Sequence, residues 1–104
     1  RRRWRAGLRP DMRLNDGERQ AILGAIGARD PQADVFLFGS RVDDASRGGD
    51  IDLLVLSRRI DLMGKLDILG DLHRHLGERR IDLLVYPDLA QPFARMAATE
   101  GIRL

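Results

Sequence analysis

The alternation of apolar and polar positions predicts one helix and two buried strands in the first half of the chain. The sequence Asn-Asp-Gly-Glu at 15–18 has the spacing of a capping box, and apolar residues at helical spacing follow it, so the helix should end near residue 29, before a proline. The apolar run 35–38 stops at a Gly-Ser pair and predicts a strand. Residues 41–49 are polar and glycine-rich, which predicts a loop or a single helical turn. Residues 50–56 predict a second strand that opens with carboxylates.

The next segment predicts a longer helix and a third strand. Asp61 can cap this helix and Gly77 can end it. Four leucines at helical spacing are expected to face the core: Leu62, Leu66, Leu69 and Leu76. Residues 81–85 are a short apolar run stopped by Pro87, which predicts the third strand.

The end of the chain predicts a final helix and a short strand. Residues 89–99 have helical spacing with Gly101 as the expected C-cap, and residues 102–104 can add an edge strand. The side chains expected to face inward are Phe93, Met96 and Ala97. The order of these elements predicts an α/β (α+β) fold class, a small mixed β-sheet with helices packed on it.

Composition excludes several classes of protein. With 104 residues, of which 43% are apolar, the chain can form one compact core but not two. Its longest uninterrupted apolar runs span four residues, so no segment is expected to cross a membrane. The absence of cysteine excludes disulfides and thiolate zinc sites, and two histidines are too few for a histidine-built metal site. The expected location is a reducing cytoplasm.

The excess positive charge is confined to the start of the chain. Residues 1–11 hold five arginines and one aspartate, whereas residues 12–104 hold 13 basic and 15 acidic residues. We therefore expect residues 1–11 to be a disordered basic head, either an upstream extension or a remnant of expression, and residues 12–104 to be the folded domain. A basic arm that binds nucleic acid weakly is the functional alternative for this head.

Three aspartates are candidate metal ligands. Successive side chains of a strand point to opposite faces, so Asp50 and Asp52 should project from the same face. Asp82 is the second residue of the third strand, and pairing of the two strands would bring it beside them. Three carboxylates this close would repel one another, and a divalent cation would remove that repulsion. Oxygen ligands favour Mg²⁺ or Mn²⁺.

The pair Gly39-Ser40 is a candidate phosphate-binding turn. Glycine allows the backbone to approach a phosphate closely, and amides that open a helical turn would point donors at the same anion. The Ser40 hydroxyl would add a further donor. Metal ions on one side and an amide-lined turn on the other form a clamp suited to a nucleoside triphosphate.

These residues resemble the signature of a known family. The segment FLFGSRVDDASRGGDIDLLV is similar to the signature of the minimal nucleotidyltransferases, members of the DNA polymerase beta superfamily: an apolar strand, Gly-Ser, about nine to thirteen residues, and Asp-x-Asp opening the next strand. Here nine residues separate Ser40 from Asp50. The segments RRIDLLV and TEGIRL resemble the family's third-carboxylate strand and its usual ending, so the resemblance covers residues 12–104. Gly49 is a departure, because relatives usually have serine there.

The resemblance implies a role for each site residue. Asp50 and Asp52 would bind the Mg²⁺ or Mn²⁺ ions that bridge the triphosphate of ATP. Asp82 would ligate the metal nearest the attacking hydroxyl and help to deprotonate that hydroxyl. The residues that would bind the nucleotide are Gly39, Ser40 and Arg41.

Length and resemblance together imply a partner. A core this small leaves one side of a nucleotide cleft open, so a separate protein would complete it. Stand-alone minimal nucleotidyltransferases of this length are typically encoded beside a small helical HEPN ribonuclease and act as its antitoxin, some by transferring AMP from ATP to a tyrosine of the toxin. We therefore predict an antitoxin that transfers AMP to a HEPN-type protein.

Three other functions stay open at this point. The chain could transfer a nucleotide to a small molecule, as aminoglycoside-modifying relatives do. It could instead keep the fold without catalysis and neutralise its partner by contact alone. It could also bind nucleic acid through the arginine-rich head.

Overall fold

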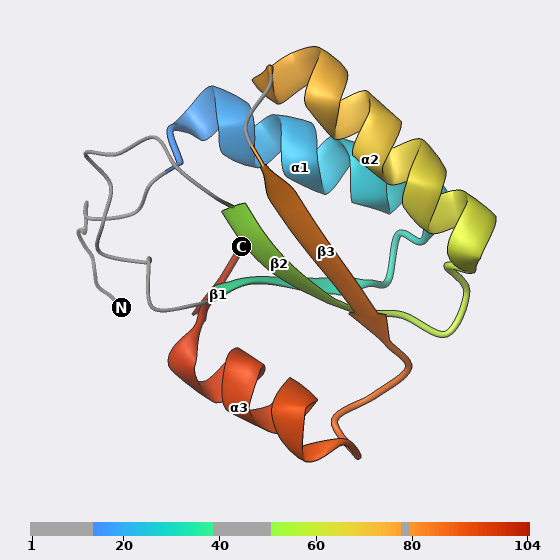
Figure 1. Ribbon diagram of the computed structural model, residues 1–104, viewed down its shortest axis with the longest axis vertical. Helices are drawn as coiled ribbons and strands as arrows, with labels where there is room; N and C mark the ends of the chain where they lie inside the picture. The colour runs from blue at the N-terminus through green and yellow to red at the C-terminus, as the bar shows by residue number, and fades with distance from the viewer. Residues whose placement is uncertain (1–13, 39–50, 78–79) are drawn as a thin grey trace.

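A computed structural model describes residues 14–38, 51–77 and 80–104. The predicted basic head, the residues Gly39, Ser40 and Arg41, and Asp50 all lie outside the described residues. The described part forms a four-stranded sheet between two layers of helix (Figure 1). The predicted fold class is confirmed.

The elements follow one another in the predicted order. They are α1 (Asp16–Arg29), β1 (Asp34–Phe38), β2 (Ile51–Leu56), α2 (Leu62–Leu76), β3 (Ile81–Tyr86), α3 (Pro92–Glu100) and β4 (Ile102–Arg103). The strand order across the sheet is β3-β2-β1-β4. Strand β2 pairs with β3 in parallel and with β1 antiparallel, and β4 pairs antiparallel with β1, so the sheet is mixed.

The ends of the first two helices are set by the predicted capping residues. Asn15 accepts a hydrogen bond from the backbone N–H of Glu18, and the Glu18 side chain accepts one from the N–H of Asn15, which completes the capping box of α1. Asp61 caps α2 by accepting a hydrogen bond from the N–H of Gly64. Gly77 ends α2 with a φ of 82°, a conformation that glycine adopts without strain.

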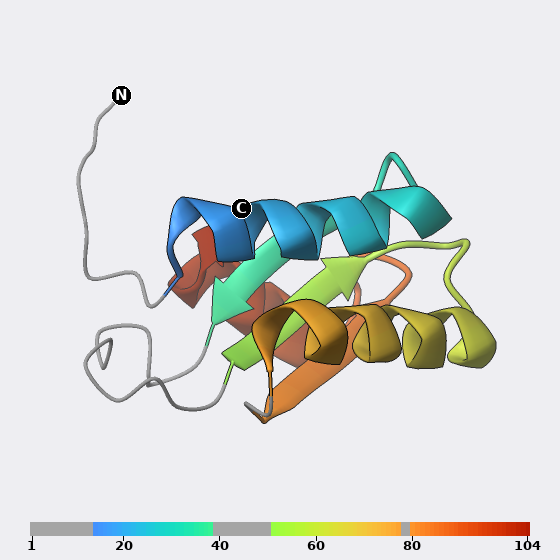
Figure 2. The same cartoon turned by 90° about the horizontal axis from the view of Figure 1, so that it is seen from above.

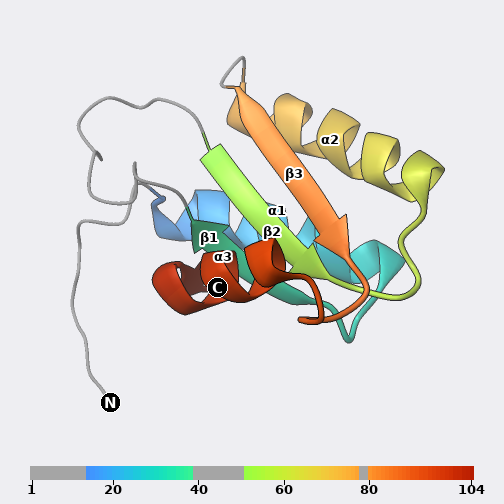
Figure 3. The same ribbon diagram turned by 60° about the horizontal axis from the view of Figure 1, so that its bottom comes forward.

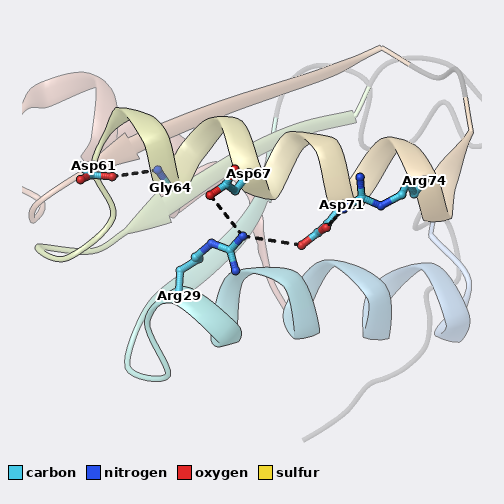
Figure 4. Close-up of polar contacts among 6 residues, drawn as sticks. All are labelled: Arg29, Asp61, Gly64, Asp67, Asp71 and Arg74. Atoms are coloured by element: carbon cyan, nitrogen blue, oxygen red, sulfur yellow. Dashed lines mark hydrogen bonds and ion pairs between the residues drawn. The ribbon is translucent and has the colours of Figure 1, made fainter.

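Helices α1 and α2 lie side by side on one face of the sheet (Figure 2). Arg29, in the last turn of α1, holds them together at one point: its guanidinium lies 3.6 Å from a carboxylate oxygen of Asp67 and 4.0 Å from one of Asp71, both on α2 (Figure 4). Asp71 is also paired with Arg74 on its own helix. The side of α2 that carries Asp67 and Asp71 therefore faces α1.

Two apolar clusters fill the two sides of the sheet. The larger one lies between the sheet and the α1–α2 layer, and its fully buried members include Ile22, Leu37, Leu53 and Leu72. The smaller one lies under α3 and is centred on Leu54, Ala94 and Ala97. No helix among the described residues is both long and apolar enough to cross a membrane.

The predicted inward face of α2 is partly wrong. Leu62 and Leu66 are 67% and 51% exposed, and the buried residues are Ile68, Leu72 and Leu76. These three residues are spaced four apart and form a stripe of their own, because the contacts with α1 fix how the helix is rotated about its axis. The leucines at 62, 66 and 69 form a second stripe beside it.

The predicted inward face of α3 is also partly wrong. Phe93 and Met96 are 37% and 46% exposed, whereas Ala94 and Ala97 are buried against the sheet. Small side chains at the contact allow α3 to lie close to the strands, which turns its larger side chains outward. Phe93 keeps an edge contact with Phe38, with ring centroids 5.7 Å apart.

A buried carboxylate closes the end of the sheet where β1 begins and β2 ends. Asp30 is 4% exposed and accepts hydrogen bonds from the Ser57 hydroxyl (2.6 Å) and the Gln32 N–H (3.0 Å). The Ser57 oxygen in turn accepts from the N–H groups of Arg59 and Ile60. The hydrogen bond from Ser57 lowers the pKa of Asp30 most, the one from the Gln32 N–H and the charge of Arg59 lower it further, and burial acts in the opposite direction.

We predict that this carboxylate makes stability fall on acidification. A pKa lowered in the folded state contributes stability that is complete above the unfolded value, near 4, and is lost as the pH falls through the folded value. Chemical denaturation of the native chain between about pH 6 and pH 2 should show this loss. In Asp30→Asn the chain should be less stable at neutral pH and should lose less further stability on acidification; an unchanged pH dependence would contradict this role.

Gly101 stands where α3 meets the sheet. A Cβ at this position would lie 2.6 Å from the carbonyl oxygens of both Ala97 and Leu37. Both oxygens belong to backbone that is held in place, in α3 and in β1. Glycine is therefore required for β4 to begin directly after the helix.

We predict that Gly101→Ala destabilises the fold by about 1–3 kcal/mol, the usual cost of forcing atoms into packed space. Gly24→Ala is the matched control, because a Cβ at Gly24 meets nothing within 4 Å on the exposed side of α1. That substitution should stabilise the chain by about 0.5–1 kcal/mol, the advantage of alanine over glycine within a helix. Urea denaturation of both variants measures the difference; equal effects would show that position 101 is not crowded.

Candidate active site

The register of β2 and β3 places two predicted site residues side by side. The strands run parallel with Asp52 aligned to Asp82, and Phe38 at the end of β1 is aligned to Asp52 from the other side. Aligned residues on neighbouring strands, which lie about 4.8 Å apart, point their side chains to the same face. The pairing is fixed at both ends, because the N–H of Ile51 donates to the carbonyl of Arg80 (2.8 Å) and the N–H of Ser57 donates to that of Tyr86 (2.9 Å).

The two carboxylates lie on the side of the sheet that carries α3. The residues on either side of each aspartate point to the opposite side of the sheet, into the cluster under α1 and α2: Ile51 and Leu53 in β2, and Ile81 and Leu83 in β3. Helix α3 packs on β1, β2 and β4 and also reaches the end of β3, where the rings of Phe93 and Tyr86 lie 6.2 Å apart, but it leaves the start of β3 open (Figure 3). Asp82 is accordingly about half exposed, with 46% of its side chain accessible.

A shallow hollow of about 420 Å³ adjoins the carboxylates. Residues of β3 from both faces of the sheet line it, together with the ends of β1 and β2 nearby and two residues of α2. The lining residues are Phe38, Asp52, Lys65, Leu69, Ile81, Asp82, Leu83 and Leu84. The hollow therefore follows the outer edge of β3 and opens at Asp52 and Asp82.

The charges around the hollow are mixed. The Arg80 guanidinium is 72% exposed, and its Nε lies 3.7 Å from a carboxylate oxygen of Asp82. Lys65 of α2 lines the hollow. An anionic group that enters the hollow would thus meet two cationic side chains, while a cation would meet two carboxylates.

The donor set of Asp52 and Asp82 fits a hard divalent cation. Carboxylate oxygens on adjacent strands can ligate one ion together, and oxygen ligands of this kind suit Mg²⁺ or Mn²⁺. Within residues 14–38, 51–77 and 80–104 no group of three or more acidic, histidine or cysteine side chains converges on one point. The described residues therefore supply two of the three predicted ligands, and Asp50 is the third.

Sequence reasoning missed Phe38 as part of this site. It is the last residue of β1, one position before Gly39, and lies between Asp52 on the neighbouring strand and Phe93 of α3. Its place directly before the Gly-Ser pair was the available signal. The two histidines, His73 and His75, are both exposed on α2, where their Nδ1 atoms lie within 3.3 Å of backbone carbonyls.

A larger hollow, of about 530 Å³, lies at the opposite end of the sheet. It contains Asp30 and Ser57, whose hydrogen bonds to one another and to the backbone hold that end together. Its remaining acidic and basic side chains include the ion pair of Arg58 with Asp88 (2.7 Å). This arrangement accounts for the polar groups there without a ligand, so the smaller hollow at Asp52 and Asp82 is the better candidate site.

Comparison with models of known protein families gives one match. The family model described as polymerase beta, nucleotidyltransferase matches residues 28–104, which include β1, β2 and β3 with both aligned aspartates. No curated protein matches the sequence. The match covers most of the chain and all four strands of the sheet that carries the carboxylates, and the chain therefore belongs to the polymerase beta nucleotidyltransferase family.

Proposed function

We propose that the chain transfers AMP from ATP to a hydroxyl group of a partner protein, with Asp50, Asp52 and Asp82 as metal ligands. The observation that carries this proposal is the alignment of Asp52 with Asp82 beside an open hollow at the edge of the sheet, in a chain of the nucleotidyltransferase family. Two like charges held on adjacent strands repel one another, and a divalent cation bound between them would relieve that repulsion. Their retention at this place is understandable if they bind Mg²⁺ or Mn²⁺.

Each of the three aspartates would have a role in AMP transfer. Asp52 and Asp82, with Asp50, would hold the divalent cation, which when bound neutralises the charge of the triphosphate. Asp82, on the outer strand, would accept the proton of the attacking hydroxyl. The hydroxyl oxygen then forms a bond to the α-phosphorus of ATP, the bond from that phosphorus to the bridging oxygen breaks, and pyrophosphate leaves.

The triphosphate would be bound by Gly39, Ser40 and Arg41. The support for this is the end of β1: Phe38 is aligned to Asp52, and Gly39 is the next residue in the chain. A glycine and a serine at this point can offer backbone and hydroxyl donors to phosphate oxygens close to the carboxylates.

The acceptor would be a tyrosine of a HEPN-type helical toxin, and the chain would act as its antitoxin in the cytoplasm. The open start of β3 supports an acceptor that is itself large, because α3 reaches only the far end of this strand, at Tyr86, and leaves Asp82 46% accessible. A partner protein could seat against that strand and close the site from outside.

We predict that Asp52→Asn and Asp82→Asn each lower AMP transfer by about 100- to 1,000-fold, the usual effect of removing one charge-stabilising group from an active site. The assay follows label from α-³²P-ATP onto the candidate HEPN-type partner in Mg²⁺ buffer. Chelation with EDTA should abolish the label and Mn²⁺ should restore it.

The matched control is Asp67→Asn, which removes a carboxylate from α2 where it pairs with Arg29 and not with the site. This variant should keep full transfer. Neutralisation of the toxin by Asp52→Asn at the native level would instead favour inhibition by contact alone, and label appearing on an aminoglycoside but on no protein would favour a small-molecule acceptor.

A further inference from the structure

The outer edge of β3 is unpaired among the described residues. Strand β3 is the first in the order β3-β2-β1-β4, so it has one neighbour. The carbonyls of Arg80 and Tyr86 accept hydrogen bonds from β2, and backbone groups alternate along a strand. The N–H and C=O groups of Ile81, Leu83 and Val85 therefore point away from β2, toward the outer edge. Such an edge is a template for an added strand.

The leucine stripe of α2 lies above this edge. Asp67 and Asp71 mark the side of α2 that faces α1, and Ile68, Leu72 and Leu76 mark the side that faces the sheet. The remaining side, away from α1, carries the stripe of Leu62, Leu66 and Leu69, by the geometry of 3.6 residues per turn. Leu69 lines the hollow beside Asp82, and the other two are largely exposed. In Figure 2, which looks onto the helical layer, α2 is drawn in front of β3 and α1 lies beside α2 in the same layer.

Two cationic side chains at this edge could pair with acidic groups of an occupant, although one of them, Arg80, also lies 3.7 Å from Asp82. Lys65 lines the hollow from α2, and Arg80 stands at the start of β3 with most of its side chain exposed. An extended segment with acidic residues near its ends would meet these two cations. Its apolar side chains on the α2 side would cover the leucine stripe, and its side chains on the other side would lie next to Asp82.

We propose that the acceptor is an extended polypeptide segment that pairs with the outer edge of β3 as a fifth strand, below Leu62, Leu66 and Leu69. This inference rests on the proposed function and names its acceptor class. A hydroxyl side chain of the segment would lie beside Asp82. Its oxygen would attack the α-phosphorus of ATP, its proton would pass to Asp82, and pyrophosphate would leave, so that the segment carries AMP.

The probe is a synthetic peptide of about ten residues, with tyrosine at its centre, leucine on either side of the tyrosine and aspartate near both ends. Transfer from α-³²P-ATP is measured for this peptide and for copies N-methylated at one position each. N-methylation removes a backbone donor, so it should lower transfer about tenfold or more at every second position and leave the positions between them little changed. Equal tolerance at all positions, or better transfer to free tyrosine or kanamycin, would overturn the proposal.

A pair of surface variants tests the leucine stripe. Leu66→Asp should raise the KM for the peptide about tenfold with little change in kcat, because it places an acid where apolar contact is expected. Met63→Asp is the matched control, since Met63 lies on the first turn of α2 outside the stripe and is 65% exposed, against 51% for Leu66. Equal KM values for the two variants would contradict docking below the stripe.

Hydrogen exchange separates this inference from the proposed function. In Asp52→Asn, without nucleotide, the peptide should slow exchange of the amides of Ile81, Leu83 and Val85. Slowed exchange without transfer by the native chain would support docking and refute AMP transfer to it. Transfer without slowed exchange would refute docking only. Slowing that depends on protein concentration and not on peptide would mean that a second copy of the chain occupies the edge, and would also overturn the proposal.

Discussion

The parallel pairing of β2 with β3 is the constraint on which the rest of this molecule depends. It aligns Asp52 with Asp82, fixes both on one side of the sheet and leaves β3 at the edge. A shift of this register by one residue would turn Asp82 into the cluster under α2 and bring Leu83 to the surface in its place. The burial of Ile81 and Leu83 therefore fixes the direction of the Asp82 side chain, since these two residues cannot be buried unless Asp82 points to the other side of the sheet.

Those parts of the fold that depend on local chemistry could be predicted from the sequence. Asn15, Asp61 and Gly77 act through hydrogen bonds or backbone conformations within a few residues, and they end the helices where expected. The strands were also predictable, because a short apolar run that ends at Gly-Ser or at a proline is typical of a buried strand. The Gly-Ser and Asp-x-Asp spacing identified the family that the comparison confirms.

The orientation of the helices could not be predicted, because it depends on contacts between distant segments. Helix α2 carries two apolar stripes, and only the ion pairs of Arg29 with Asp67 and Asp71 and the packing below decide which one is buried. In α3 the large side chains suggested the inner face, but alanines fit the short distance to the sheet. The alignment of Asp82 with Asp52 likewise needed the strand order, which no local pattern contains.

The separation of the two aligned aspartates along the chain determines when they meet during synthesis and folding. They are thirty residues apart, and all of α2 lies between them. The antiparallel pair of β1 and β2 can close early, but the third strand must be synthesised and carried across the helical layer before the carboxylates meet. A nascent chain released before residue 81 would hold Asp52 without its aligned partner Asp82. The aligned carboxylate pair therefore exists only in a chain that has formed a non-local contact, and a chain that has folded as far as β2 does not yet have it.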